Sequence, residues 1–212
     1  MDIYQIVISH NSGWTRKEIT IFSIVLMVFF AILNKKVERH KISKSQAISI
    51  FLLTGFLGIV FASTVFNRET SVRSYELMPF WSWRQIIFKT DKELLIEVLL
   101  NCVLLFPMGV LLPFIFEKKL RWRKIFICGF LVSAVIETCQ LVFKCGLFEW
   151  DDMIHNGVGC MFGGMIGNVF FAKVRVYACL SRLSCGEMSK DGTQQVPPFE
   201  LSPLRVDMAR GQ

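Results

Sequence analysis

The sequence predicts an all-α integral membrane protein with five membrane-spanning helices, and three observations support this prediction. Of its 212 residues, 53% are hydrophobic and 20 are Phe, with a mean hydropathy of +0.47. Such a composition is too apolar for an ordinary soluble domain. The apolar residues form five runs of helical length, and most Lys and Arg residues lie between or beyond these runs. The net charge of +7 therefore reflects membrane topology rather than nucleic-acid binding, and we expect the lipid bilayer as the main partner.

The five runs make up a predicted transmembrane domain over residues 19–172. It follows a polar N-terminal segment, 1–18, and precedes a Ser/Pro/Gly-rich tail, 173–212, which we expect to be disordered. The first run is short of the ~20 residues that cross a bilayer, but Trp14 and Asn34 suggest a small extension at both ends. The predicted spans are residues 19–33, 47–66, 94–116, 125–143 and 153–172.

The distribution of positive charge predicts the orientation of these spans. Segments 34–46, 117–124 and 173–212 together hold 16 Lys and Arg residues, whereas the alternate segments hold 8. The richer set faces the cytoplasm by the positive-inside rule. We therefore expect the N-terminus outside the cell, the C-terminus in the cytoplasm, and the acidic stretch 149–152 outside.

The external loop before the third span contains an aromatic, apolar segment, residues 77–83. It is too short to span a membrane. Either it lies in the membrane interface, where Trp rings favour the headgroup level, or it packs as an ordinary loop.

Each of the last three spans carries an acid and an amide about one helical turn apart. Such pairs share a helix face, and under the predicted orientation all three lie in the outer leaflet. We therefore predict an outer-leaflet polar pocket that binds a ligand. The candidate ligand-binding residues are Glu97 and Asn101, Glu137 and Gln140, and Asp152 and Asn156.

Simpler roles remain open for most of these side chains. Glu97 can snorkel to the interface, Asn101 and Gln140 can be interhelical hydrogen-bond donors, and Asp152 can cap a helix. A carboxylate at the depth of Glu137 costs ~2.5–3.5 kcal/mol to insert, and must be protonated, paired or hydrated. If the pocket is catalytic, Glu137, Asp152 and Glu97 are the candidates. Candidate cationic partners are Arg68, Arg73, Arg84, Lys89 and His155, of which His155 is more typical of a structural residue.

Glycines follow the polar pair of the last span at the same spacing of four: Gly159, Gly163 and Gly167. Small residues in such a strip let a neighbouring membrane helix approach closely. We expect that neighbour to bring its own polar groups to Asp152 and Asn156.

The common motifs of site chemistry are missing from the sequence. It has no glycine-rich phosphate loop, no HExxH and no GxSxG in context. The seven cysteines show no ligand spacing, and carboxylates without a convergent His or Cys set make a catalytic zinc site improbable. Oxygen ligands would suit Mg²⁺ or Ca²⁺, but nothing in the spacing demands either ion. We predict no metal and no cofactor.

Three motifs in order resemble the VanZ-like family of small bacterial membrane proteins, over roughly residues 77–170. The stretch from Glu97 to Gly109 resembles the family's E-x-x-x-N-x-x-x-F-x-P-x-G, with Leu105 at the Phe position. The second motif is S-x-x-x-E-x-x-Q from Ser133 to Gln140, and the third is F-x-x-x-D-x-x-x-N-x-x-G from Phe148 to Gly159. The family usually has an Arg shortly before the third motif, where this chain has Lys144-Cys145-Gly146. The resemblance implies a role in tolerance of the glycopeptide teicoplanin or in the bacterial cell envelope.

Three functions are compatible with these features. The first is a non-enzymatic protein that binds or shields an envelope component, such as a lipid-linked wall precursor or a lipid headgroup. The second is an intramembrane enzyme that modifies such a lipid, with one carboxyl group as general base and another as acid or metal ligand. The third, an ion-coupled transporter, is disfavoured because five spans without inverted repeats offer no second half for alternating access.

Overall fold

The described part of the chain is almost entirely helical and confirms the predicted all-α, multi-pass membrane fold. The computed structural model describes residues 14–66, 74–76 and 78–187, without the side chains of 66, 74, 75 and 181–187. Five helical segments within these residues are long and apolar enough to cross a membrane. They are Arg16–Glu38, Lys44–Val65, Lys92–Ile115, Trp122–Phe143 and Trp150–Leu180.

Helix α2 (Arg16–Glu38) is longer than the run predicted at residues 19–33 because it has a strong N-terminal cap. The Thr15 hydroxyl accepts a hydrogen bond from the Glu18 amide at 3.3 Å, and the Glu18 carboxylate accepts one from the Thr15 amide at 2.8 Å. This reciprocal pair is a capping box. Only Leu33 of α2 is buried, so nearly the whole helix surface is available to lipid.

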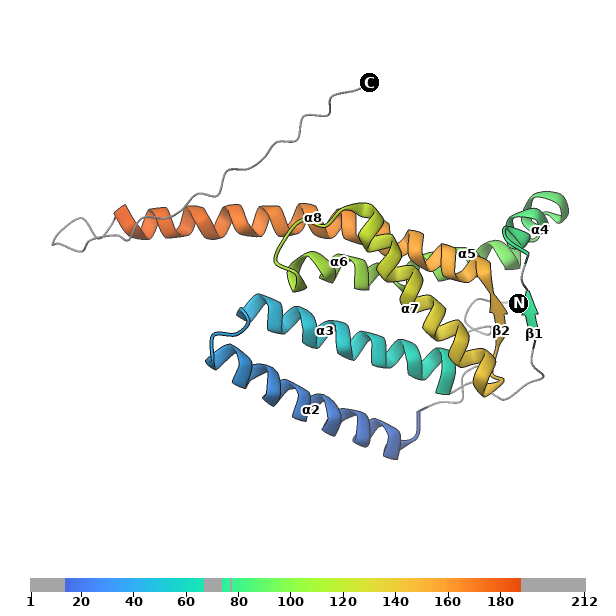
Figure 1. The fold of residues 1–212 in the computed structure, drawn as a ribbon, viewed down its shortest axis with the longest axis horizontal. Helices are drawn as coiled ribbons and strands as arrows, with labels where there is room; N and C mark the ends of the chain where they lie inside the picture. The colour runs from blue at the N-terminus through green and yellow to red at the C-terminus, as the bar shows by residue number, and fades with distance from the viewer. Residues whose placement is uncertain (1–13, 67–73, 77, 188–212) are drawn as a thin grey trace, which may run out of the picture. The chain divides into compact units, whose positions relative to one another are not determined.

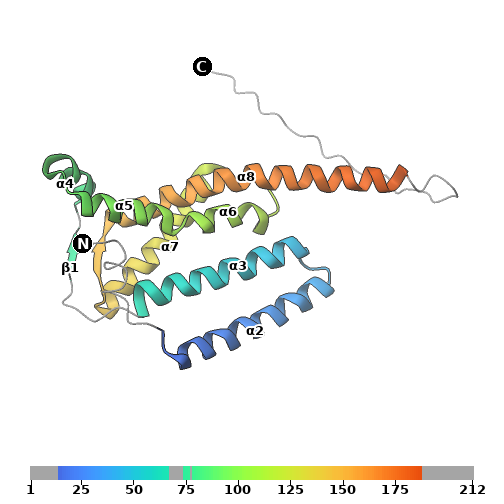
Figure 2. The same cartoon turned by 180° about the vertical axis from the view of Figure 1, so that it is seen from behind.

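Helix α3 (Lys44–Phe61) continues into a π-helical turn, Ala62–Phe66, and separates α2 from the other spans. Both views of the ribbon show α3 between α2 and α6 (Figures 1 and 2). Leu53, Phe56 and Leu57 of α3 pack against the main core cluster. α3 therefore joins the outermost helix to the bundle.

The third predicted span, residues 94–116, consists of two helices rather than one. α5 (Lys92–Leu104) ends next to Leu105, and α6 (Phe106–Ile115) begins directly after it, with Pro107 in its first turn. Proline has no backbone N–H, and its ring clashes with the carbonyl four residues earlier, so it interrupts a continuous helix. Leu105, fully buried at the break, lies in the core with Met108, Leu112, Ile125 and Cys160.

A short helix and a strand pair lie at one end of the bundle. Most of the aromatic segment predicted at residues 77–83 lies in a turn and the start of helix α4 (Trp81–Lys89), while residue 77 is outside the described residues. Strand β1 (Ser74–Glu76) pairs in parallel with β2 (Leu147–Glu149), with Glu76 in register with Glu149. Figures 1 and 2 show α4 and both strands at the end opposite the α2–α3 connection.

The predicted close approach along the glycine strip is confirmed. A Cβ added at Gly159, Gly163 or Gly167 of α8 (Trp150–Glu187) would overlap backbone atoms of α5 or α6. Another side of α8 packs on α7 (Trp122–Phe143), where Gly129 meets Cys160. The first turns of α8 are therefore held between α5 and α7.

The two ends of the sequence are only partly within the described residues. α8 continues beyond the predicted span end at residue 172 to Glu187, so the first part of the predicted tail is helical. The chain divides into two compact units, Met1–Arg175 and Val176–Gln212. Residues 1–13 of the predicted polar segment, and residues 188–212, where we expect disorder, lie outside the described part.

Candidate functional site

The start of α8 brings an acid of one span to an amide of another. Asp151 and Asp152 lie in its first turn, where carboxylates interact favourably with the positive end of the helix dipole. Asn101 Nδ2 of α5 donates a hydrogen bond to Asp152 Oδ1 at 2.5 Å. The glycine strip explains this contact, because Gly159 lies against the backbone of Cys102, the residue after Asn101.

Ser133 of α7 extends this contact toward the other predicted residues on α8. Asn156 Nδ2 donates to Ser133 Oγ at 2.9 Å, and Ser133 Oγ lies 3.5 Å from the Asp152 carbonyl oxygen. Ser133 and Asn156 are both buried, and Asn156 Oδ1 has no hydrogen-bond partner within the described residues. A buried acceptor left without a donor costs ~1–3 kcal/mol, so this oxygen is a candidate contact for a ligand or a water molecule.

Glu137 lies one helical turn after Ser133 on α7 and is 3% exposed. Its Oε2 accepts a hydrogen bond from the backbone amide of Glu149 on β2 at 3.1 Å. The buried carboxylate therefore holds the strand that leads into α8, and it links the α7 side of the site to the acidic stretch.

Glu149 has the clearest electrostatic perturbation of the groups outside the spans. Burial, together with the nearby carboxylates of Asp152, Glu97, Asp151 and Glu76, raises its pKa to about 7. Like charges in a desolvated place disfavour ionisation. Glu97, an exposed residue on α5, is thus close enough to act on the site through its charge. Glu149 was not among the predicted site residues, although it lies inside the acidic stretch.

Gln140 is separate from this group. It is buried, but its Nε2 donates to the carbonyl oxygen of Thr64, near the end of α3, at 3.1 Å. The backbone carbonyl oxygen of Gln140 accepts a hydrogen bond from the backbone amide of Cys145 at 3.0 Å. The structure thus brings Asn101 to Asp152 and, through Ser133, near Asn156, while Gln140 bonds to another helix.

Asp151 and His155, one turn apart on α8, hold helix α4. Asp151 Oδ1 and Oδ2 accept the backbone amides of Phe80 at 2.6 Å and Ser82 at 2.8 Å. Trp83 Nε1 donates to His155 Nε2 at 2.9 Å, which assigns the proton of a neutral imidazole to Nδ1. That nitrogen is buried and has no partner in the described part of the chain. Asp151 was not among the predicted site residues, because its only signal in the sequence is its place in an acidic run.

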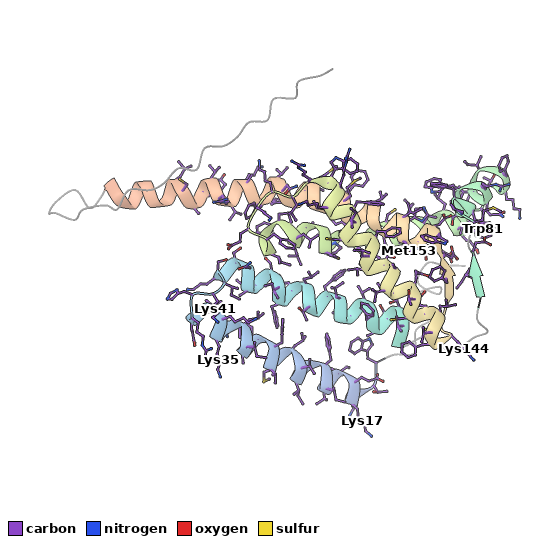
Figure 3. All side chains as sticks on the ribbon, in the orientation of Figure 1. Lys17, Lys35, Lys41, Trp81, Lys144 and Met153 are labelled. Atoms are coloured by element: carbon purple, nitrogen blue, oxygen red, sulfur yellow. The ribbon has the colours of Figure 1, made fainter. Side chains whose placement is uncertain are left out.

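The candidate cations that the structure describes do not neutralise the acids. Arg84, Lys89 and Lys144 are exposed, and within the described residues none of them forms an ion pair with an acid. Lys144, where the resembling family has a nearby Arg, ends α7 with a left-handed backbone conformation, φ 58°. Figure 3 shows Lys144 and Trp81 toward the end with the strands, and Lys35 and Lys41 at the opposite end. Arg68 and Arg73 lie outside the described residues.

This arrangement provides hydrogen-bond acceptors at the start of α8. Carboxylate and amide oxygens bind ammonium, hydroxyl or amide donors, and a carboxyl group that titrates near neutrality can exchange protons. In the part of the chain that the structure describes, no group of three or more His, Cys, Asp or Glu side chains is placed to hold a metal ion.

Comparison with protein families gives one match. A family model described as VanZ/LLP1 matches residues 20–171. The match covers most of the chain, all the predicted site residues, and the Asp151 and His155 contacts to α4. No curated protein and no solved structure matches the chain significantly.

Proposed function

Because this chain belongs to the VanZ/LLP1 family, we propose that it binds or shields a component of the bacterial cell envelope and so contributes to tolerance of teicoplanin. The component would be a lipid-linked wall precursor or a lipid headgroup that reaches the site from the bilayer. The resemblance to VanZ-like proteins supports the link to glycopeptides, and the five spans support a membrane-bound ligand.

The observation that carries this proposal is the half-buried contact between Asp152 and Asn101, with the buried Asn156 beside it. Polar side chains within spanning helices cost free energy to insert into the membrane, and they are usually paired or functional. Three different helices supply Asn101, Ser133 and Asn156. Asn156 Oδ1, which has no partner among the described residues, is a further acceptor. Such a group suits a ligand that carries N–H or O–H donors, such as an amino-sugar, peptide or amine headgroup.

We place the site in the outer leaflet, with the N-terminus outside and the C-terminus in the cytoplasm. The charge distribution of the sequence supports this orientation. Lys35, Lys36 and Lys41 lie at the α2–α3 connection, the end away from the site. Wall precursors and glycopeptides meet at the outer membrane surface, so this orientation is the one that a shielding function requires.

Teicoplanin tolerance of site variants at matched protein levels tests the proposal. Asp152→Asn and Glu137→Gln keep size while removing the ability to ionise, and we expect both to lose most of the protection. Glu97→Gln should lose less, because this side chain is exposed and acts only through its charge. Glu93→Gln, an exposed carboxylate at the same end of α5, is the matched control and should retain full tolerance. Full tolerance in all variants would mean that these side chains only pack the helices together and bind no envelope component.

An intramembrane enzyme that uses Glu137 and Asp152 is the second candidate. The observation in its favour is the carboxyl group of Glu149, whose pKa of about 7 suits proton transfer at neutral pH. Comparison of lipid and wall-precursor profiles with and without the gene separates the two functions. A new lipid or precursor species requires catalysis, whereas unchanged profiles with altered drug binding support shielding.

A further inference from the structure

Helix α4 has an exposed apolar face, although its Trp81 and Ile86 are half-buried. Four apolar side chains form this face of the helix and its N-cap, and their exposed fractions are 57% for Phe80, 41% for Trp83, 69% for Ile87 and 79% for Phe88. Ser82, on the opposite side, is only 1% exposed. In a water-soluble protein the apolar face of an amphipathic helix points inward. The reversal indicates that the outward face of α4 contacts something other than water.

The contacts of α4 with α8 fix this orientation. Asp151 binds the amides of Phe80 and Ser82, and His155 binds the indole nitrogen of Trp83. The bonds to the backbone amides hold the Ser82 side of α4 against the start of α8, and the bond from Trp83 fixes the edge of the apolar face. Rotation that buried Ile87 and Phe88 would break them, so the apolar face stays outward while they are intact.

Helix α4 is joined by a short connection to a helix whose exposed apolar residues face lipid. Only Thr90 and Asp91 separate α4 from α5, a membrane-spanning segment. On α5, Leu99 and Val103 are 56% and 64% exposed, which places them toward acyl chains. Leaving such surface in water costs about 25 cal/mol per Å², so lipid is the natural occupant of the exposed apolar face of α4 as well.

Positive charge on α4 matches the headgroup level of a bilayer. Arg84 lies on the same face as Phe80 and Phe88, and it is exposed apart from a contact of 3.2 Å between its Nη1 and Met78 Sδ. Lys89 ends the helix and is exposed. Long basic side chains reach from the acyl boundary to lipid phosphates, and aromatic side chains favour the same depth.

We propose that α4 is an interfacial helix that binds phospholipid at the boundary between headgroups and acyl chains, in the leaflet next to the polar site. Ile87 and Phe88 enter the acyl region, while Arg84 binds the phosphate of anionic phospholipid. α4 thereby lies between the bilayer surface and the acids at the start of α8. This proposal rests on the exposed face of α4 and does not depend on the proposed envelope ligand.

Photocrosslinking of the purified full-length protein in liposomes of phosphatidylcholine and phosphatidylglycerol tests this inference. p-Benzoyl-phenylalanine replaces Phe88, a change that keeps the ring, and intact-mass spectrometry identifies the adducts after irradiation. The same residue in place of Leu99 is the lipid-facing reference, and in place of Lys144 it is the exposed loop reference. We expect a phospholipid adduct at 88 with a yield within about threefold of that at 99, and at least tenfold above that at 144.

A yield at 88 as low as that at 144 would overturn the proposal, because α4 would then face water. A protein–protein adduct at 88 in place of the lipid adduct would also overturn it, since a second copy would then cover the face. Arg84→Gln gives an independent measurement in the Phe88-substituted background. It should lower the share of phosphatidylglycerol among the lipid adducts, because phosphatidylglycerol carries a net negative charge and phosphatidylcholine does not. An unchanged share would refute the assignment of Arg84 to the phosphate of anionic phospholipid.

Discussion

The contact between α8 and α5 predicts that Gly159→Ala destabilises the protein, although Ala is the better helix former. A Cβ at this position would overlap the backbone carbonyl of Cys102, which no side-chain rotation can move. Only separation of the two helices relieves the overlap, and overpacking of this kind costs ~1–3 kcal/mol. The higher helix propensity of Ala relative to Gly offsets about 0.8–1.0 kcal/mol of this cost. Because the obstacle is backbone, we take the upper end of the cost and expect a net loss of about 2 kcal/mol.

Gly55→Ala provides the matched control for this substitution. Gly55 also lies within a spanning helix, but a Cβ there would be 3.9 Å from the nearest Leu26 atoms, an ordinary van der Waals contact. We expect the control to be neutral or slightly stabilised. The double variant Gly159→Ala/Gly163→Ala should lose less than the sum of its single losses, because one separation of the helices relieves both overlaps.

Unfolding in detergent micelles, followed by circular dichroism under increasing denaturant, measures these differences. Gly159→Ala should also reduce teicoplanin tolerance, because separation of the helices lengthens the hydrogen bond between Asn101 and Asp152. If Gly159→Ala proves as stable as Gly55→Ala, the close approach of α8 to α5 is wrong, and the geometry derived for the site fails with it.

Three further predictions follow from the same geometry. Asp151→Ala leaves two backbone amides of α4 without their acceptor, and the loss of such a cap costs ~1 kcal/mol of helix stability. Trypsin should therefore cleave α4 faster than in the Glu93→Gln control, and an unchanged rate would contradict the capping role. Because its pKa is raised, Glu149 keeps its proton in the folded state up to about pH 7, so its contribution to the stability of the protein falls as pH rises from about 4.5 to 7. Glu149→Gln should remove this fall in unfolding measurements from pH 5 to 8. Parallel stability curves for the variant and the wild type would contradict the raised pKa. The topology can be tested with Lys144→Cys, because the native Cys145 is too buried to react with a label. In intact protoplasts, a membrane-impermeant thiol reagent should label Lys144→Cys above the wild-type level, but should not do so for Lys41→Cys. The reverse pattern would place the polar site in the inner leaflet.

Much of the fold was predictable because long apolar runs and glycine spacing are strong local signals. The strip from Gly159 to Gly167 indicated a close neighbour, and α5–α6 fills that place. Two boundaries were shifted by local signals that the hydropathy pattern does not contain. The Thr15–Glu18 capping box extends α2 toward the N-terminus, and Pro107 divides the third span.

The site was less predictable because spacing along a helix does not say which neighbour a side chain meets. Glu137 and Gln140 are three residues apart, yet one bonds to β2 and the other to the end of α3. The pairing of β1 with β2 involves only three residues in each strand, too few for an alternating pattern to show. The binding of α4 by Asp151 depends on these long-range contacts, so only the structure shows it.

The most direct test of the central claim is native mass spectrometry of the protein purified from its own membranes. We predict that the wild-type protein carries a lipid-linked envelope component, identified by its mass after release. Asp152→Asn should lose most of this occupancy, while Glu93→Gln should retain it, with both variants showing the wild-type circular dichroism spectrum. A wild-type protein with no such component, or with equal occupancy in Asp152→Asn, would contradict the assignment of this polar site as the place where the envelope component binds.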